Sequence, residues 1–251
     1  LFALSTLLIL IFLFVLQVDV AAGAISFLGI ETTGRRIYNI QKFVNVSYSW
    51  VSIALFIWGT FLAVFASSGL IPSVLEAGRI ALLLSKPLSR TALLLGRYVG
   101  NLAIVAINHT YLVLTVWIIL GLKTDIWSPR FLLAIPVSIF LFAVLLCVVV
   151  LVGVVSESAA LSVMAPVGLS LISLLLAQHQ FVVRLLSSEW SRQLWMFFYW
   201  ILPKVFDLGN AMRQTILFDR SAAWLMPVAT SAAFGVVALA TALHIFQKRD
   251  F

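Results

Sequence analysis

The sequence has 251 residues, of which 63% are hydrophobic and only 10% are charged. An ordinary soluble domain is about one quarter charged, so this composition excludes that class and predicts an integral membrane protein. The net charge of +7 fits contact with lipid headgroups better than binding to nucleic acid, because no basic patch interleaved with aromatic residues occurs in the sequence.

Apolar stretches of about 20 residues predict membrane-crossing helices, and the shorter alternating segments of a β-barrel do not occur. We therefore expect an all-α integral membrane protein whose residues 1–251 form a single transmembrane domain with six transmembrane helices. The predicted spans are residues 1–18, 46–70, 98–122, 131–155, 159–178 and 223–246. The first residues contain neither Met nor a basic stretch, so we expect them to continue a longer gene product.

The connections between the predicted spans differ in length. Residues 123–130 and 156–158 are short turns, whereas residues 19–45, 71–97 and 179–222 are long. Segment 71–97 is apolar but cannot be a span, because its five charges would cost roughly 15 kcal/mol near the bilayer centre and its leucines return only about 4 kcal/mol. These charged residues are Glu76, Arg79, Lys86, Arg90 and Arg97.

Two prolines and a serine divide segment 71–97. Pro72 suits the first turn of a helix, whereas Pro87 interrupts one because it lacks the N–H group. Ser89 is a candidate N-cap for a helix that continues into the third span. We predict a short helix, a corner at Pro87 and a second helix that enters the membrane.

The string EAGRIALLLSKPLSRTALLLGR at residues 76–97 resembles a motif of the permease subunits of type-2 ABC transporters, in the branch of multicopper-enzyme-maturation permeases. The matching features are an acidic residue, a glycine, the run ALLLSKPLSR, the run LLLG and a final Arg97. The terminal FQKRDF is also similar to the ending of that family. The branch name does not imply metal handling, because the sequence contains no cluster of His, Met or Cys.

The resemblance implies that segment 71–97 is a cytosolic coupling helix between spans 2 and 3. It would dock on an ATPase through Glu76, Gly78, Arg79, Leu83, Ser85, Lys86, Pro87 and Arg90. It further implies two ABC ATPase subunits that carry ATP and Mg, a second permease subunit that is identical or related, and a multi-pass position in the cytoplasmic (inner) membrane of a bacterium. The alternative for this segment is an amphipathic helix that only lies on lipid.

The long fifth connection contains, in residues 181–222, charges spaced too closely for a full crossing. Its aromatic residues form a cluster typical of a membrane interface, so we expect it to dip into the membrane and return at Pro203. The resemblance implies a pair of gate helices, in which the gate-like residues are Trp195, Tyr199, Trp200 and Pro203. The alternative is a surface helix that only anchors the protein.

Catalytic chemistry is missing from the sequence. No phosphate-binding G-x-x-x-x-G-K-[ST] string occurs, so we expect no enzymatic activity, cofactor or metal site in this chain, and no nucleic-acid partner. The lone Cys147 reads as a buried apolar residue. Asn108 and His109 in the third span are possible pathway residues, although a packing role for the histidine is favoured. Gly96 and Gly100 form a G-x-x-x-G pair for which intrachain packing is favoured over dimerisation.

The distribution of Lys and Arg conflicts with the orientation that the motif implies. With both ends in the cytoplasm, the inner connections carry six basic residues and the outer ones ten, contrary to the positive-inside tendency. We keep this orientation because a coupling segment has to meet a cytosolic ATPase. The predicted function is the permease subunit of an ATP-driven exporter; the alternatives are a non-transporting membrane scaffold and a stand-alone carrier.

Overall fold

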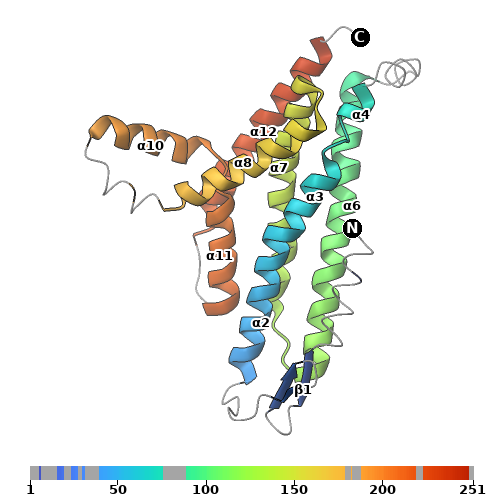
Figure 1. The fold of residues 1–251 in the computed structure, drawn as a ribbon, viewed down its shortest axis with the longest axis vertical. Helices are drawn as coiled ribbons and strands as arrows, with labels where there is room; N and C mark the ends of the chain where they lie inside the picture. The colour runs from blue at the N-terminus through green and yellow to red at the C-terminus, as the bar shows by residue number, and fades with distance from the viewer. Residues whose placement is uncertain are drawn as a thin grey trace.

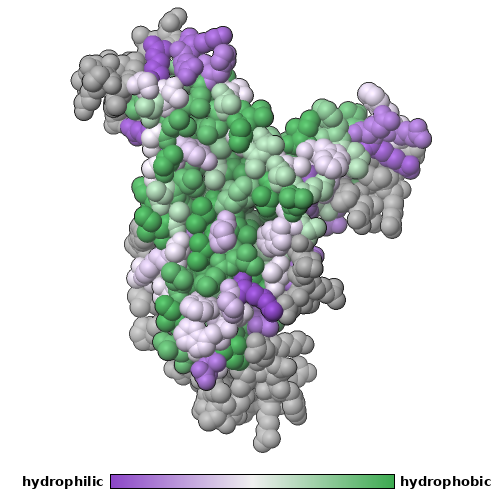
Figure 2. Space-filling model, turned by 180° about the vertical axis from the view of Figure 1, so that it is seen from behind, coloured by the Kyte–Doolittle hydropathy of each residue, from purple (hydrophilic) through white to green (hydrophobic). Residues whose placement is uncertain are grey.

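The structure is a computed structural model. It describes residues 40–75, 89–178, 188–218 and 223–248, with isolated pieces at residues 6, 16–19, 24–27, 30–31 and 182. The described part is predominantly α-helical and contains five helices that are long and apolar enough to cross a membrane. Figure 2 shows a broad hydrophobic surface over the body of the molecule. The predicted helical membrane protein is therefore confirmed at this level.

The five helices correspond to the predicted spans two to six. The second span is built from α2 (Ile40–Ala54), η1 (Leu55–Gly59) and α3 (Thr60–Ser67), and a short α4 (Pro72–Leu75) follows it. The remaining helices are α6 (Arg90–Thr124), η2 (Pro129–Leu133), α7 (Ala134–Ser156), α8 (Ala159–Leu176), α10 (Glu189–Ile201), α11 (Val205–Phe218) and α12 (Leu225–Lys248). Figure 1 shows α10 lying across the direction of the long helices.

A small antiparallel sheet near the start of the chain was not predicted. It consists of β1 (Leu16–Asp19), β2 (Ala24–Phe27) and β3 (Ile30–Glu31) in the order β1-β2-β3. The strand β1 takes in residues 16–18, which the prediction had assigned to the first span; residue 6 is helical, and the rest of that span lies outside the described residues. Figure 1 places the sheet at the end of the bundle where α2 begins.

Helix α7 forms the centre of the bundle. It contains no charged residue and packs against α12, α8, α6 and α3, as expected for a helix that is apolar on all sides. The hydroxyl of Tyr98 in α6 donates to the carbonyl of Ala143 in α7 at 3.1 Å. Cys147, also in α7, is buried, in agreement with its interpretation as an apolar residue.

The second span contains a π-helical turn, η1, between α2 and α3. The backbone N–H of Thr60 donates to the carbonyl of Leu55, five residues earlier, so the helix is locally wide. Such turns are rare in proteins and occur frequently at functional sites. The turn therefore singles out the middle of the second span for closer description.

Candidate functional site

Most of the predicted coupling segment lies outside the described residues. This applies to Glu76, Gly78, Arg79, Leu83, Ser85, Lys86 and Pro87. At its two edges the structure agrees with the sequence, because α4 begins at Pro72 and α6 begins directly after Ser89. The Ser89 side chain accepts a hydrogen bond from the backbone N–H of Ala92 at 3.1 Å, which is the geometry of an N-cap.

Arg90 and Thr91, at the start of α6, contact the end of the C-terminal helix α12. The guanidinium of Arg90 donates to the backbone carbonyl of Gln247 at 3.1 Å. In return, the side-chain amide of Gln247 donates to the hydroxyl of Thr91 at 2.8 Å. The two stretches that carry the family resemblance, the PLSR motif and the C-terminal ending, therefore adjoin in space.

Segment 181–222 contains two helices, α10 and α11, that meet at an elbow around Pro203. Leu202 leaves α10 in extended conformation, with φ −77° and ψ 150°, and α11 begins at Val205. The structure thus has a helix break at Pro203, because the residue before a proline is pushed out of helical geometry; the expected dip of this segment into the membrane stays a prediction. The gate function of this pair of helices remains a prediction.

Serine side chains from two spans hold the elbow in place. The backbone N–H of Lys204 donates to the hydroxyl of Ser231 in α12 at 3.0 Å. The backbone N–H of Phe206 donates to the hydroxyl of Ser173 in α8 at 3.2 Å. Both donors lie at the start of α11, where backbone N–H groups lack partners within the helix. The elbow is therefore fixed to the fifth and the sixth predicted spans.

Lys204 is the most unusual residue of the elbow, because only 3% of its surface is exposed. Its ammonium donates to the backbone carbonyl of Tyr199 and lies 3.8 Å from the centroid of the Tyr199 ring. The Tyr199 hydroxyl in turn donates to a carboxylate oxygen of Asp207 at 3.2 Å. A buried lysine, a buried tyrosine and a half-buried aspartate thus form one network at the hinge of the predicted gate.

The protonation of this network follows from its burial. Burial lowers the pKa of Lys204, and the negative charge of Asp207 acts in the opposite direction. Burial, together with the charge and the hydrogen bond of Asp207, raises the pKa of Tyr199 to about 12. Loss of the Asp207 charge would therefore lower both pKa values. This change favours the neutral form of Lys204 and the anionic form of Tyr199.

The predicted gate residues do not share one environment. Tyr199 is buried, whereas 54% of Trp200 is exposed, with its ring centroid 5.6 Å from the Lys204 ammonium. Trp195, one turn before Tyr199, has a buried indole nitrogen without a protein partner among the described residues. Most large apolar side chains of α10 are exposed: Trp190, Leu194, Met196, Phe197, Phe198, Trp200 and Ile201. This surface is apolar enough to lie in a membrane interface.

The possible pathway residues in α6 are buried within the bundle. Asn108 is 4% exposed and His109 is 1% exposed. The Nδ1 atom of His109 lies 3.0 Å from the carbonyl of Val105, and a Cβ atom added at Gly59 would lie 3.4 Å from the Nε2 atom. His109 thus packs against η1 of the second span, which is the packing role that the sequence favoured.

The G-x-x-x-G pair does not pack within the chain as expected. A Cβ atom added at Gly96 or at Gly100 would have no described atom within 4 Å, and both residues are exposed. The expectation of intrachain packing is therefore wrong for the described part of the protein. The two glycines instead leave a shallow outward face near the start of α6.

Sequence reasoning missed the network at the elbow because it treated Lys204 and Asp207 only as charges that exclude a crossing. Asp207, four residues after Pro203, was a usable signal for a helix start, because a carboxylate is favourable in the first turn of a helix; Lys204 gave no such signal. Within the described ranges, no group of three or more His, Cys, Asp or Glu is placed to hold a metal ion. Comparisons of the chain with protein-family models, curated proteins and solved structures gave no match.

Proposed function

We propose that this protein is the membrane permease subunit of an ATP-driven exporter of the type-2 ABC kind. A separate ATPase would hydrolyse ATP with Mg, and two permease subunits would form the transport unit. Segment 71–97 would receive the motion of the ATPase, and α10 and α11 would gate the opposite end of the pathway. The resemblance of residues 76–97 to the family motif is the starting point of this proposal.

The observation that carries the proposal is the way α6 begins. A helix that starts at a capped Ser89, immediately after the motif, transmits a displacement of the motif directly into the third span. The bonds from Arg90 and Thr91 to Gln247 extend the same displacement to α12. Helix α12 also supplies Ser231 to the elbow of α10 and α11, so one continuous path leads from the motif to the predicted gate.

The proposal can be tested by searching the neighbouring genes for an ABC ATPase and reconstituting that ATPase with the protein in lipid vesicles. We expect the permease to raise ATP turnover at least severalfold, and Arg90→Ala to abolish most of that increase. Arg130→Ala is the matched control, because Arg130 is an exposed arginine of η2, at the far end of α6. Binding of the ATPase with unchanged turnover would favour a scaffold, and activity without any ATPase would favour a stand-alone carrier.

The orientation has its own test. Cys147 is buried and is the single cysteine of the sequence, so Cys147→Ala gives a background without thiols. In that background, Ser85→Cys should resist an impermeant thiol reagent in intact cells and react after the cells are opened. Reaction in intact cells would place the segment outside and would contradict the coupling role.

A further inference from the structure

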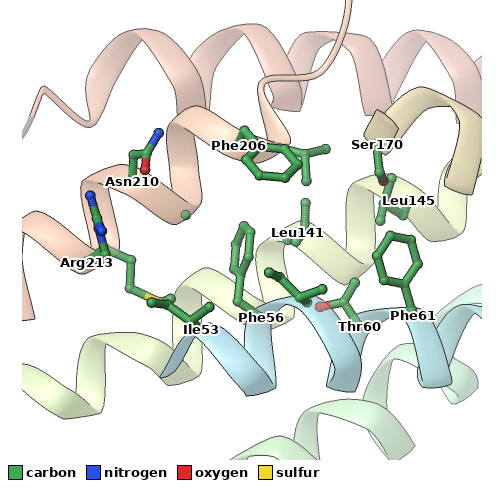
Figure 3. A pocket seen from close by; sticks show the side chains of 14 residues that line it. Ile53, Phe56, Thr60, Phe61, Leu141, Leu145, Ser170, Phe206, Asn210 and Arg213 are labelled. Atoms are coloured by element: carbon green, nitrogen blue, oxygen red, sulfur yellow. The ribbon is translucent and has the colours of Figure 1, made fainter. Parts of the chain in front are cut away.

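A pocket lies between the second span and α11. Its volume is about 220 Å³, and its walls come from α2, η1, α3, α7, α8 and α11. Figure 3 shows Asn210 and Arg213 together at one end and Ser170 at the other, with the Phe56 and Phe206 rings between them. The pocket is therefore a mainly apolar space with a polar, cationic end.

Thr60 places an unused polar atom inside this space. Thr60 is 2% exposed, lines the pocket, and its hydroxyl has no hydrogen-bond partner among the described residues. Other span hydroxyls donate to the carbonyl four residues earlier, as Ser52 does to Tyr48 at 2.7 Å and Ser67 to Ala63 at 2.6 Å. In Figure 3 the oxygen of Thr60 points along the pocket toward Phe56.

The local backbone explains why Thr60 differs from its neighbours. Thr60 directly follows the π-helical turn, whose wider winding bonds its N–H to Leu55 and changes the positions of the preceding carbonyls. A buried hydroxyl without a partner costs about 1–3 kcal/mol. A π-turn that incurs this cost inside a pocket is the pattern expected of a binding site rather than of a structural defect.

The charged end of the pocket is supplied by α11. Arg213 is exposed at this end, and within the described ranges it forms no ion pair with a carboxylate. Asn210 lies one turn earlier on the same helix and adds an amide that can donate a hydrogen bond. The middle of the pocket is apolar, and the end at Arg213 is cationic. A complementary ligand therefore carries a negative charge next to a hydrocarbon part.

The volume limits the size of that ligand. A cavity of about 150 Å³ accommodates benzene, whereas sites for drug-sized molecules begin at about 300 Å³. A pocket of about 220 Å³ therefore suits a short hydrocarbon chain or a single substituted ring. A whole phospholipid is too large to be enclosed.

We propose that this pocket binds a small amphipathic anion, with its hydrocarbon part between Phe56 and Phe206, a polar atom at the Thr60 hydroxyl and its carboxylate or phosphate at Arg213. The site belongs to a single subunit and lies directly after the elbow, since Val205 and Phe206 form part of its wall. A ligand there would contact α11 and the second span at once. The inference does not require the proposed transport function, because binding involves this chain alone.

The test is equilibrium dialysis of radiolabelled octanoate against the protein in phosphatidylcholine nanodiscs, with protein-free nanodiscs subtracted. We expect saturable binding that octyl phosphate displaces and that octanol or octylammonium displaces at least tenfold less well. Displacement by octanoate only, and not by octyl phosphate, would identify a carboxylate ligand; equal displacement by both anions would leave either headgroup acceptable. Equal displacement by octanol would overturn the proposal, because it would show partition of hydrocarbon without recognition of charge.

Two variants examine the two polar contacts. Arg213→Gln should weaken octanoate binding about tenfold, the size of one charge-assisted hydrogen bond, and leave octanol unaffected. Thr60→Val should weaken binding of 8-hydroxyoctanoate, whose terminal hydroxyl can supply the polar atom at Thr60, about fivefold without loss of folding. The matched controls are Arg130→Gln and Thr115→Val, which lie outside the pocket. Unchanged octanoate binding in Arg213→Gln, or unchanged 8-hydroxyoctanoate binding in Thr60→Val, contradicts the assignment of that contact, and the wild-type displacement series decides the matter if a variant does not fold.

Discussion

The guanidinium of Arg90 and the backbone carbonyl of Gln247 are joined by a 3.1 Å hydrogen bond across 157 positions of sequence. Together with the bond between Gln247 and Thr91, this contact makes the start of α6 and the end of α12 neighbours. The predicted coupling residues up to Pro87 come just before Ser89 in the sequence, so they lead into the end that these two spans share.

A cross-linking experiment tests this neighbourhood. In a Cys147→Ala background, the pair Thr91→Cys and Gln247→Cys should be joined rapidly by a short bifunctional thiol reagent, because the two native side chains are in hydrogen-bond contact. The control pair is Thr91→Cys and Thr241→Cys, whose second site lies nearly two turns earlier in α12. Gel mobility measures the joined fraction, and similar yields for both pairs would speak against the contact.

The N-cap of α6 gives a stability prediction. Ser89→Ala removes the acceptor of the Ala92 N–H group and should lower the free energy of unfolding by about 1 kcal/mol. Ser158→Ala removes a longer cap bond of 3.4 Å at the start of α8 and should cost less. Thermal unfolding in detergent compares the two variants; a larger loss for Ser158→Ala would contradict the ranking.

The elbow network makes a prediction about ionisation. Asp207→Asn should lower the pKa of Tyr199 from about 12, because the burial and an acceptor oxygen remain but the aspartate charge that opposes the phenolate is lost. Absorbance at 295 nm during an alkaline titration measures the phenolate, and the same titration of Tyr199→Phe identifies which part of the signal belongs to Tyr199. An unchanged midpoint in Asp207→Asn would show that the two side chains do not interact.

The same two groups affect stability at alkaline pH in opposite directions. The raised pKa of Tyr199 stabilises the folded state fully below pH 10, and this contribution is lost as the pH rises toward about 12. The lowered pKa of Lys204 means that the unfolded chain binds more protons just below pH 10.5, so stability from this group rises with pH there. Lys204→Met should remove that rise, as unfolding curves recorded at pH 8 to 10.5 would reveal.

Thr60 allows binding and stability to be separated. Thr60→Val keeps the side-chain volume and removes a hydroxyl without a described partner, so the free energy of unfolding should rise by about 1 kcal/mol. Thr115→Val is the comparison, because the hydroxyl of Thr115 is bonded to the Tyr111 carbonyl at 2.8 Å and no gain is expected. Equal changes in the two variants would show that Thr60 is satisfied in the folded protein.

The outward glycines give a test of subunit association. Gly96→Leu and Gly100→Leu place side chains where no described atom lies within 4 Å, so the fold of the single chain should tolerate them. If a second permease packs on this face, both variants should shift the protein from dimer to monomer in cross-linking or mass photometry. Dimers of unchanged abundance would assign the face to lipid.

Local chemistry decided which features were predictable from the sequence. The cap at Ser89, the helix start at Pro72 and the break at Pro203 depend on neighbouring residues, and the structure reproduces all three. The five described spans follow from the cost of placing charge in a bilayer. Their ends differ from the prediction by a few residues, and α6 extends back to Arg90.

The remaining features depend on contacts between distant segments. The π-turn lies where η1 packs between His109 of α6 and Gly209 of α11. The packing against α11 is close, because a Cβ atom added at Gly209 would lie 2.8 Å from the Phe56 ring. The burial of Lys204 requires α8 and α12 to hold the elbow. The three-stranded sheet was missed because residues 16–18 continue an apolar run that reads as a span by composition.

Helix α6 has 35 residues, which corresponds to about 52 Å of helix, whereas the hydrocarbon layer is about 30 Å thick. It contains no proline and no widened turn, unlike α8 with Pro166 and the second span with η1. A stiff rod that outreaches the lipid pivots as one piece, so tilting it at Ser89 swings its distant tip at Asp125. The proline of α8 and the π-turn of the second span are therefore the places beside α6 where a span can bend.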